Sequence, residues 1–181
     1  YHLFSNDNVV EAYSYRSDWP TYVSVDWGFA HDMAVGFFQV NPMNGHVFLF
    51  DEIIQNKLTL DQLWERLKPR MQSYQIHTWF CDIAGNQERE LTGQSNLKWF
   101  KDRGIYMKHT RDSVSNGISV VRSYICNTAG MRRFFVSANC KKSVDGLKQY
   151  RYREKDGVIV NENPIKKDDD AVAFAGHLGF L

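Results

Sequence analysis

Two short apolar runs that each end in an aspartate constrain this chain more than any other feature of its sequence. Tyr22-Val-Ser-Val ends in Asp26 and turns at Gly28, and Thr78-Trp-Phe-Cys ends in Asp82. Each run has the length and composition of a β-strand. A turn-forming aspartate is one explanation for each position. A carboxylate at the end of a buried strand is costly unless its charge is paired. The second explanation is therefore a positive partner that both aspartates share.

A third acidic site, Asp168-Asp-Asp170, precedes a helical apolar stripe that runs from Ala171 to Leu178. One aspartate at such a place is an ordinary helix N-cap. Three in succession exceed what a cap needs, and each like-charged neighbour raises the cost of ionising the others. A bound cation would remove that cost.

The order of the apolar runs predicts a mixed α/β sheet. Turn-forming residues up to Pro20 are interpreted as a lead-in over residues 1–20, before one domain at 21–181. Strands are expected at 21–26, 33–40 and 46–54, and the turn signal at 41–45 makes these first three strands antiparallel. Thr59 followed by Gln62 resembles a capping box at the start of a helix over 59–74. Pro69 warns of a kink or an early end in that helix.

Beyond this helix, strands and helices alternate. A strand is expected at 76–83, a helix at 95–102, a strand at 105–109, a helix at 117–126, a strand at 133–137, a helix at 140–150, a hairpin at 150–160 that turns at Asp156-Gly157, and a last helix at 169–179. The result is a sheet whose first three strands are antiparallel, whose later strands are parallel, and whose faces carry helices.

The three acidic sites are predicted to converge. Strands in the centre of an α/β sheet present their ends to a common crevice. A ligand set made only of carboxylate oxygens suits Mg²⁺ or Mn²⁺ and argues against zinc. Two such ions about 4 Å apart can activate a water and stabilise the leaving oxygen of a phosphodiester.

Positive charge gathers in one third of the chain. Residues 131–167 hold ten Lys/Arg and four Asp/Glu, a net charge of +6, whereas the whole chain carries +1. Such a local field suits a polyanionic substrate, although a solvated basic face explains it as well. The candidate phosphate contacts are Lys141, Lys142, Arg151, Arg153, Lys166 and Lys167. No apolar run approaches the roughly 18 residues of a membrane span, so no membrane partner is expected.

Three motifs carry a resemblance to a known family. Val-Ser-Val-Asp26-Trp-Gly, Trp-Phe-Cys-Asp82 and Lys-Lys-Asp-Asp-Asp-Ala-Val-Ala-Phe-Ala175 are similar to the carboxy-terminal nuclease domain of the large terminase subunit of tailed bacteriophages. The similarity runs from about Thr21 to Leu181. It implies an RNase H-like fold in which Asp26 is the metal ligand on the first strand and Asp82 the ligand on the fourth.

The resemblance leaves the last ligand open by one position. Many members read Asp-Asp-x-x-Asp-Ala in the last helix, whereas this chain has Ala173 at the second acidic position. Asp169, Asp170 or both match the helix ligand, and Asp168 is a further candidate. Asp32 falls where some members carry an additional acidic residue near the metals.

The resemblance also implies a function and partners. We expect an endonuclease that cuts double-stranded DNA with two Mg²⁺ or Mn²⁺ ions, and that cuts concatemeric viral genomes during packaging. No Walker A loop is present, so an N-terminal ATPase motor domain is expected outside this sequence, which begins at Tyr1. A portal protein and a small terminase subunit are further expected partners, and the expected location is the host cytoplasm at the viral procapsid.

Two other functions fit the same residues. One is a Holliday-junction resolvase or a transposase-type nuclease on the same fold. The other is a non-catalytic DNA-binding or assembly module, in which the aspartates only cap helices and pair with basic side chains.

Overall fold

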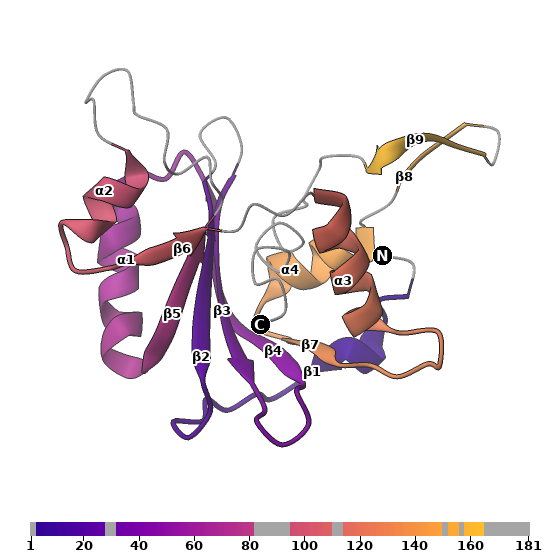
Figure 1. Cartoon of the computed structure of the whole chain (residues 1–181), viewed down its shortest axis with the longest axis horizontal. Helices are drawn as coiled ribbons and strands as arrows, with labels where there is room; N and C mark the ends of the chain where they lie inside the picture. Colours follow the sequence, from indigo (N-terminus) through magenta and orange to yellow (C-terminus); the bar gives the residue numbers. More distant parts are fainter. Residues whose placement is uncertain are drawn as a thin grey trace.

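The computed structural model describes residues 3–27, 32–81, 95–109, 114–149, 152–155 and 158–164. Its centre is a seven-stranded sheet with the order β1-β7-β4-β3-β2-β5-β6 (Figure 1). The strands are β1 (Val9–Val10), β2 (Thr21–Asp26), β3 (Asp32–Val40), β4 (Val47–Asn56), β5 (Ile76–Cys81), β6 (Met107–His109) and β7 (Phe134–Ser137). A separate antiparallel pair is formed by β8 (Tyr152–Lys155) and β9 (Val158–Pro164).

The directions of the strands match the predicted mixed sheet. β3 runs antiparallel to both β2 and β4, whereas the pairs β1–β7, β4–β7, β2–β5 and β5–β6 are parallel. Six strands therefore run toward the same edge of the sheet, which we call the carboxyl edge: β1, β2, β4, β5, β6 and β7. β3 begins there.

Helices cover both faces of the sheet (Figure 1). α1 (Leu60–Ser73) and α2 (Asn96–Lys101) lie on one side, and α3 (Val114–Ile125) and α4 (Lys141–Gln149) lie on the other. A short 3-10 helix, η1 (Asn6–Asn8), precedes β1.

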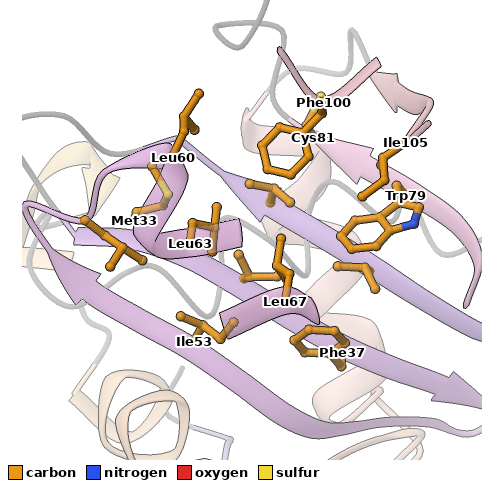
Figure 2. Close-up of a cluster of buried hydrophobic side chains, with 14 of the residues drawn as sticks. Met33, Phe37, Ile53, Leu60, Leu63, Leu67, Trp79, Cys81, Phe100 and Ile105 are labelled. Carbon is orange, nitrogen blue, oxygen red and sulfur yellow. The ribbon is translucent and has the colours of Figure 1, made fainter. Parts of the chain in front are cut away.

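The core under α1 follows from the spacing of its apolar residues. Leu60, Leu63 and Leu67 recur at helical intervals and point onto the strands, where Leu63 and Phe37 are fully buried (Figure 2). Burying each such side chain contributes about 1.5–3 kcal/mol. The predicted capping box is present, because the Thr59 hydroxyl accepts from the Gln62 N–H and the Gln62 side chain accepts from the Thr59 N–H.

The extent of α1 matches its predicted range of 59–74, whereas that of α3 differs from its prediction. α1 continues through Pro69 to Ser73, so the proline does not end it. α3 begins at Val114, three residues before the predicted start at Gly117. Glycine is a weak helix former, but α3 also buries Val121 and Ile125 fully against the sheet, and this packing outweighs the local preference.

The first twenty residues contribute to the main sheet. β1 pairs with β7, and the side chain of Asn8 is fully buried. Tyr13 packs on Phe48, with ring centroids 5.1 Å apart. The predicted division between a lead-in and a domain at residue 20 stays a prediction.

Some predicted elements lie outside the described residues. These are the end of the strand at 82–83, the turn at Asp156-Gly157 and the last helix at 169–179. Among the helices that the structure describes, none combines the length and the apolar character needed to cross a membrane.

Candidate functional site

Asp26 lies at the carboxyl edge, in the middle of the sheet. It is the last residue of β2, it is half-buried, and it faces Ala34 of β3 in the register. Val23 and Val25 are fully buried in the core under α1. Because side chains alternate along a strand, Asp26 belongs to the opposite face, which α3 and α4 cover.

The two strands that carry the predicted aspartates are direct neighbours. β2 and β5 are parallel, and Val25 is in register with Cys81. Val25 precedes Asp26, and Cys81 precedes Asp82. The structure thus brings together the two strand ends that the sequence predicts to supply metal ligands, although Asp82 itself lies outside the described residues.

The residue after Asp26 anchors this strand end. Trp27 packs against the core under α1, and its ring centroid lies 5.6 Å from that of Phe100. The end of β2 is therefore held by buried apolar side chains before and after Asp26, which fixes where the Asp26 carboxylate can reach.

The remaining predicted ligands are described only in part. Asp32 is the first residue of β3, where its backbone pairs with Asn56 at the carboxyl edge. The cluster Asp168-Asp-Asp170 lies outside the described residues. No group of three His, Cys, Asp or Glu side chains able to hold a metal occurs within the part of the chain that is described, which leaves out most of the predicted ligand set. The hard oxygen donor at Asp26 suits Mg²⁺ or Mn²⁺.

A further carboxylate, Glu52, lies on the same part of the sheet but is hydrogen-bonded to a helix and is not a predicted metal ligand. Glu52 of β4 is in register with Gly36, which is in register with Ser24, two residues before Asp26. Its Oε1 accepts from the Lys142 N–H at 3.0 Å, and its Oε2 accepts from the Ser143 N–H at 3.1 Å and from the Ser143 hydroxyl. Glu52 therefore caps the start of α4.

Glu52 was not among the residues predicted from the sequence to lie near the site. The signal was the pair Asp51-Glu52 inside the apolar run of β4, because adjacent acids on a strand need partners on opposite faces. The partners themselves could not be found, since Ser143 follows Glu52 by 91 residues.

Asp51 serves the opposite face of the sheet. Its carboxylate accepts from Arg70 Nε at 2.7 Å and from the Tyr74 hydroxyl at 3.2 Å. Burial, together with the charge and hydrogen bond of Asp51, raises the pKa of Tyr74 to about 12. This group tethers α1 to β4 and stands apart from the carboxyl-edge site.

Of the predicted phosphate contacts, the structure places Lys141 and Lys142 at the exposed start of α4. The Lys142 ammonium donates to the Ile54 carbonyl at 3.0 Å. Ile54 is in register with Ala34, the residue opposite Asp26. Arg153 belongs to β8, while Arg151, Lys166 and Lys167 lie outside the described residues.

Comparison with known proteins places this geometry in a family. The model of the terminase RNaseH-like domain matches residues 23–175. A search of curated proteins gave no match.

Solved structures share the fold across nearly the whole chain. The nuclease domain of the phage P22 large terminase is 18% identical, with a TM-score of 0.76, over 99% of this chain and 91% of that one. The nuclease domain of g2p, the large terminase of bacteriophage SPP1, was solved with bound Mn and is 12% identical, with a TM-score of 0.69, over 94% of each chain.

A longer large terminase, from a thermophilic bacteriophage, is 16% identical, with a TM-score of 0.75, over 98% of this chain. This chain spans only 43% of that protein, which was also solved with ADP. The fold is RNase H-like, as the sequence predicted.

Proposed function

Because this chain belongs to the terminase RNase H-like domain family, we propose that it is a metal-dependent endonuclease that cuts double-stranded DNA during the packaging of a viral genome. The observation that carries the proposal is the register of β2 and β5. Val25 pairs with Cys81, so Asp26 lies beside the end of the adjacent parallel strand, the strand that Asp82 follows in the sequence. Adjacent strand ends are where an α/β sheet builds its sites.

The proposed ligands for two Mg²⁺ or Mn²⁺ ions are Asp26, Asp82 and one or both of Asp169 and Asp170. Asp32 and Asp168 are further candidates. When bound, such ions supply an activated water and stabilise the leaving oxygen of the phosphodiester. The Mn in the SPP1 nuclease domain supports a divalent ion on this fold.

The chain's own residues have separate tasks in this scheme. Asp26 holds its carboxylate at the end of a strand that Val23 and Val25 bury in the core, so the ligand is fixed before any ion arrives. Lys142 and the other predicted basic residues would bind the DNA backbone, which carries one negative charge per nucleotide on each strand.

The wider context is also proposed. The whole protein would carry an N-terminal ATPase motor domain. The large terminase of the thermophilic phage, which is more than twice as long as this chain and was solved with ADP, supports this arrangement. The nuclease would cut concatemeric DNA at the viral procapsid in the host cytoplasm, together with a portal protein and a small terminase subunit.

The test is plasmid cleavage by the wild type and Asp26→Asn in Mg²⁺, Mn²⁺, Ca²⁺ or EDTA. We expect cutting in Mg²⁺ or Mn²⁺ only, and a loss of at least about a hundredfold in the variant, since even the outer partners of metal ligands are worth 10–100-fold. Asp61→Asn, an exposed aspartate of α1 on the other face, is the matched control and should cut normally.

Other outcomes favour the other functions. Preferential cutting of branched DNA would favour a resolvase or a transposase-type nuclease. A folded wild-type protein that binds no divalent metal would favour a non-catalytic DNA-binding module.

A further inference from the structure

The start of helix α4 is fastened to β4 by the carboxylate of Glu52. Both oxygens of Glu52 are occupied by the first turn of α4, through the backbone N–H groups of Lys142 and Ser143 and the Ser143 hydroxyl. Ser143 is fully buried and its two bonds to Glu52 are half-buried, whereas the Lys142 bond is exposed. Hydrogen bonds to an ionised carboxylate are about twice as strong as neutral ones. The start of α4 therefore cannot move away from β4 without breaking three of them.

This fastening decides where the Lys142 ammonium lies. With its backbone held at Glu52, the Lys142 side chain extends along β4 and donates to the Ile54 carbonyl two residues further on. Ile54 pairs with Ala34, and Ala34 pairs with Asp26. Neighbouring strands lie about 4.8 Å apart, so the Ile54 backbone is roughly 10 Å from that of Asp26.

Glu52 also changes what the helix terminus can bind. A free helix N-terminus attracts anions through its unpaired N–H groups. At α4 the carboxylate of Glu52 already takes that position. Positive charge at this end of α4 is therefore supplied by side chains. The Lys142 ammonium contacts Ile54, which lies in the same cross-strand row as Ala34 and Asp26.

We propose that Glu52 is a positioning residue for DNA binding, which holds the start of α4 so that Lys142 contacts a backbone phosphate beside the cleavage site. This rests on the proposed nuclease function. The separation of roughly 10 Å between the Ile54 and Asp26 backbones, at about 3.4 Å of helix rise per nucleotide, places the contacted phosphate within a few nucleotides of the bond that is cut.

The test is the salt dependence of duplex DNA binding by the 181-residue chain in EDTA, where no cutting can occur. Each phosphate contact contributes about 0.9 to the slope of log K against log salt. Lys142→Met should weaken binding and lower the slope by about 0.9. Glu52→Gln should do the same, because it replaces one of the two accepting oxygens with an NH₂ group, which cannot accept from the N–H that it would face. The double variant should lose no more than either single one.

Whether Glu52→Gln weakens or tightens DNA binding distinguishes positioning of Lys142 from a direct effect of the Glu52 charge. Removing a negative charge near DNA would by itself tighten binding, whereas loss of the Lys142 position weakens it. Tighter binding by Glu52→Gln, an additive loss in the double variant, or an unchanged slope in Lys142→Met would each overturn the proposal. Lys68→Met, on the exposed surface of α1, should leave the slope unchanged.

Ser143→Ala distinguishes positioning of Lys142 from a purely structural role of Glu52. This variant removes one of the three hydrogen bonds to Glu52 and leaves the two from backbone N–H groups. It should lower the slope less than Glu52→Gln does, although the loss of a half-buried hydrogen bond also lowers the melting temperature. Full wild-type slope together with a lowered melting temperature would count against positioning. Failure of the nuclease proposal would show separately, as a wild type that binds DNA with the expected slope but cuts under no metal.

Discussion

Adjacent acidic residues in β4 serve opposite faces of the sheet. Asp51 pairs with Arg70 of α1, and Glu52 caps α4 on the other side. The alternation of side chains along a strand is the cause. Each acid is paired within its own layer, so the sheet carries two charges in its interior without leaving either unpaired.

Breaking the Asp51 pair should cost more stability than breaking an ion pair on the surface. The side chains of Arg70 and Asp51 are 27% and 16% exposed, respectively. Asp51→Ala would leave a half-buried guanidinium unpaired, and we expect a loss of about 2 kcal/mol, below the roughly 3–5 kcal/mol of a fully buried pair. Urea unfolding measures it. Asp102→Ala, which breaks the exposed pair with Lys98, should cost less than about 1 kcal/mol.

Tyr74 should make the protein sensitive to alkali. Burial and Asp51 raise its pKa from 10.0 to about 12. The unfolded chain therefore releases this proton at a lower pH than the folded one. The contribution of Tyr74 to stability is complete below about pH 10 and is lost as the pH rises through about 12.

We expect the free energy of unfolding to fall over this pH window less steeply in Tyr74→Phe than in the wild type. Urea unfolding at several pH values between about 9 and 12 measures the slope. Tyr106→Phe, whose ring is 70% exposed, is the control and should keep the wild-type slope. Equal slopes in all three proteins would contradict the role given to Tyr74.

At the scale of elements, a buried asparagine joins the start of the chain to the link between α3 and β7. The Asn8 amide donates to the carbonyls of Ile125 and Phe134, both at 2.9 Å. Its oxygen accepts from Arg132 at 2.8 Å, and Arg132 also donates to the Leu3 carbonyl. These contacts explain why two residues suffice for β1, since side chains supply the bonds that a longer strand would have made.

Asn8→Ala should therefore destabilise the whole domain and not only its first residues. It leaves two buried carbonyls without this donor, each worth about 1–3 kcal/mol, and we expect a loss of about 3 kcal/mol. Chemical unfolding followed by tryptophan fluorescence measures it. Asn6→Ala, which removes only an exposed contact with Lys148, is the matched control. A loss no larger than that control would mean that the first residues fold independently of α3.

At the scale of the whole molecule, six strands of the main sheet run toward one edge, which makes the carboxyl edge the natural place for a charged site. Asp26 and the end of β5 lie there, and so does the start of α4. Residues far apart in the sequence are thereby gathered around one strand end. A metal that binds several of the predicted ligands would link β2 and β5 to parts of the chain near residue 170.

Metal binding should accordingly stabilise the fold. An ion that binds only the folded state adds about 2.7 kcal/mol at a concentration of about 100 times its Kd. We expect Mn²⁺ to raise the melting temperature of the wild type in a concentration-dependent way and to leave that of Asp26→Asn unchanged. Differential scanning fluorimetry with and without EDTA measures this. An equal shift in both proteins would place the binding elsewhere.

Under the proposed function, the remainder of the terminase should restrain cleavage by this domain. Unregulated cutting would damage the genome being packaged, so we expect the isolated chain to cut plasmid DNA faster than the full-length protein without its packaging partners. Single-turnover cleavage at equal metal concentration compares the two. A faster full-length protein would show instead that the motor domain supplies DNA binding.

Local sequence determined those features that depend on neighbours along the chain. The apolar run ending at Asp26 predicted β2 to the residue, and Thr59 with Gln62 predicted the start of α1. Gly45, with φ at +70°, ends the turn between β3 and β4 as the Asn-Gly signal indicated. These are interactions over two to four residues, where sterics and capping decide the outcome.

The tertiary structure decided which elements extend and which side chains meet. Pro69 stays inside α1, and α3 begins before Gly117, because burial on the sheet outweighs local propensity. The sequence singled out Asp26 by its place at the end of a strand. It could not assign Glu52 to Ser143 or Asn8 to Phe134, since those contacts join residues 91 and 126 positions apart. Only the packing of helices on the sheet brings such partners within hydrogen-bonding distance.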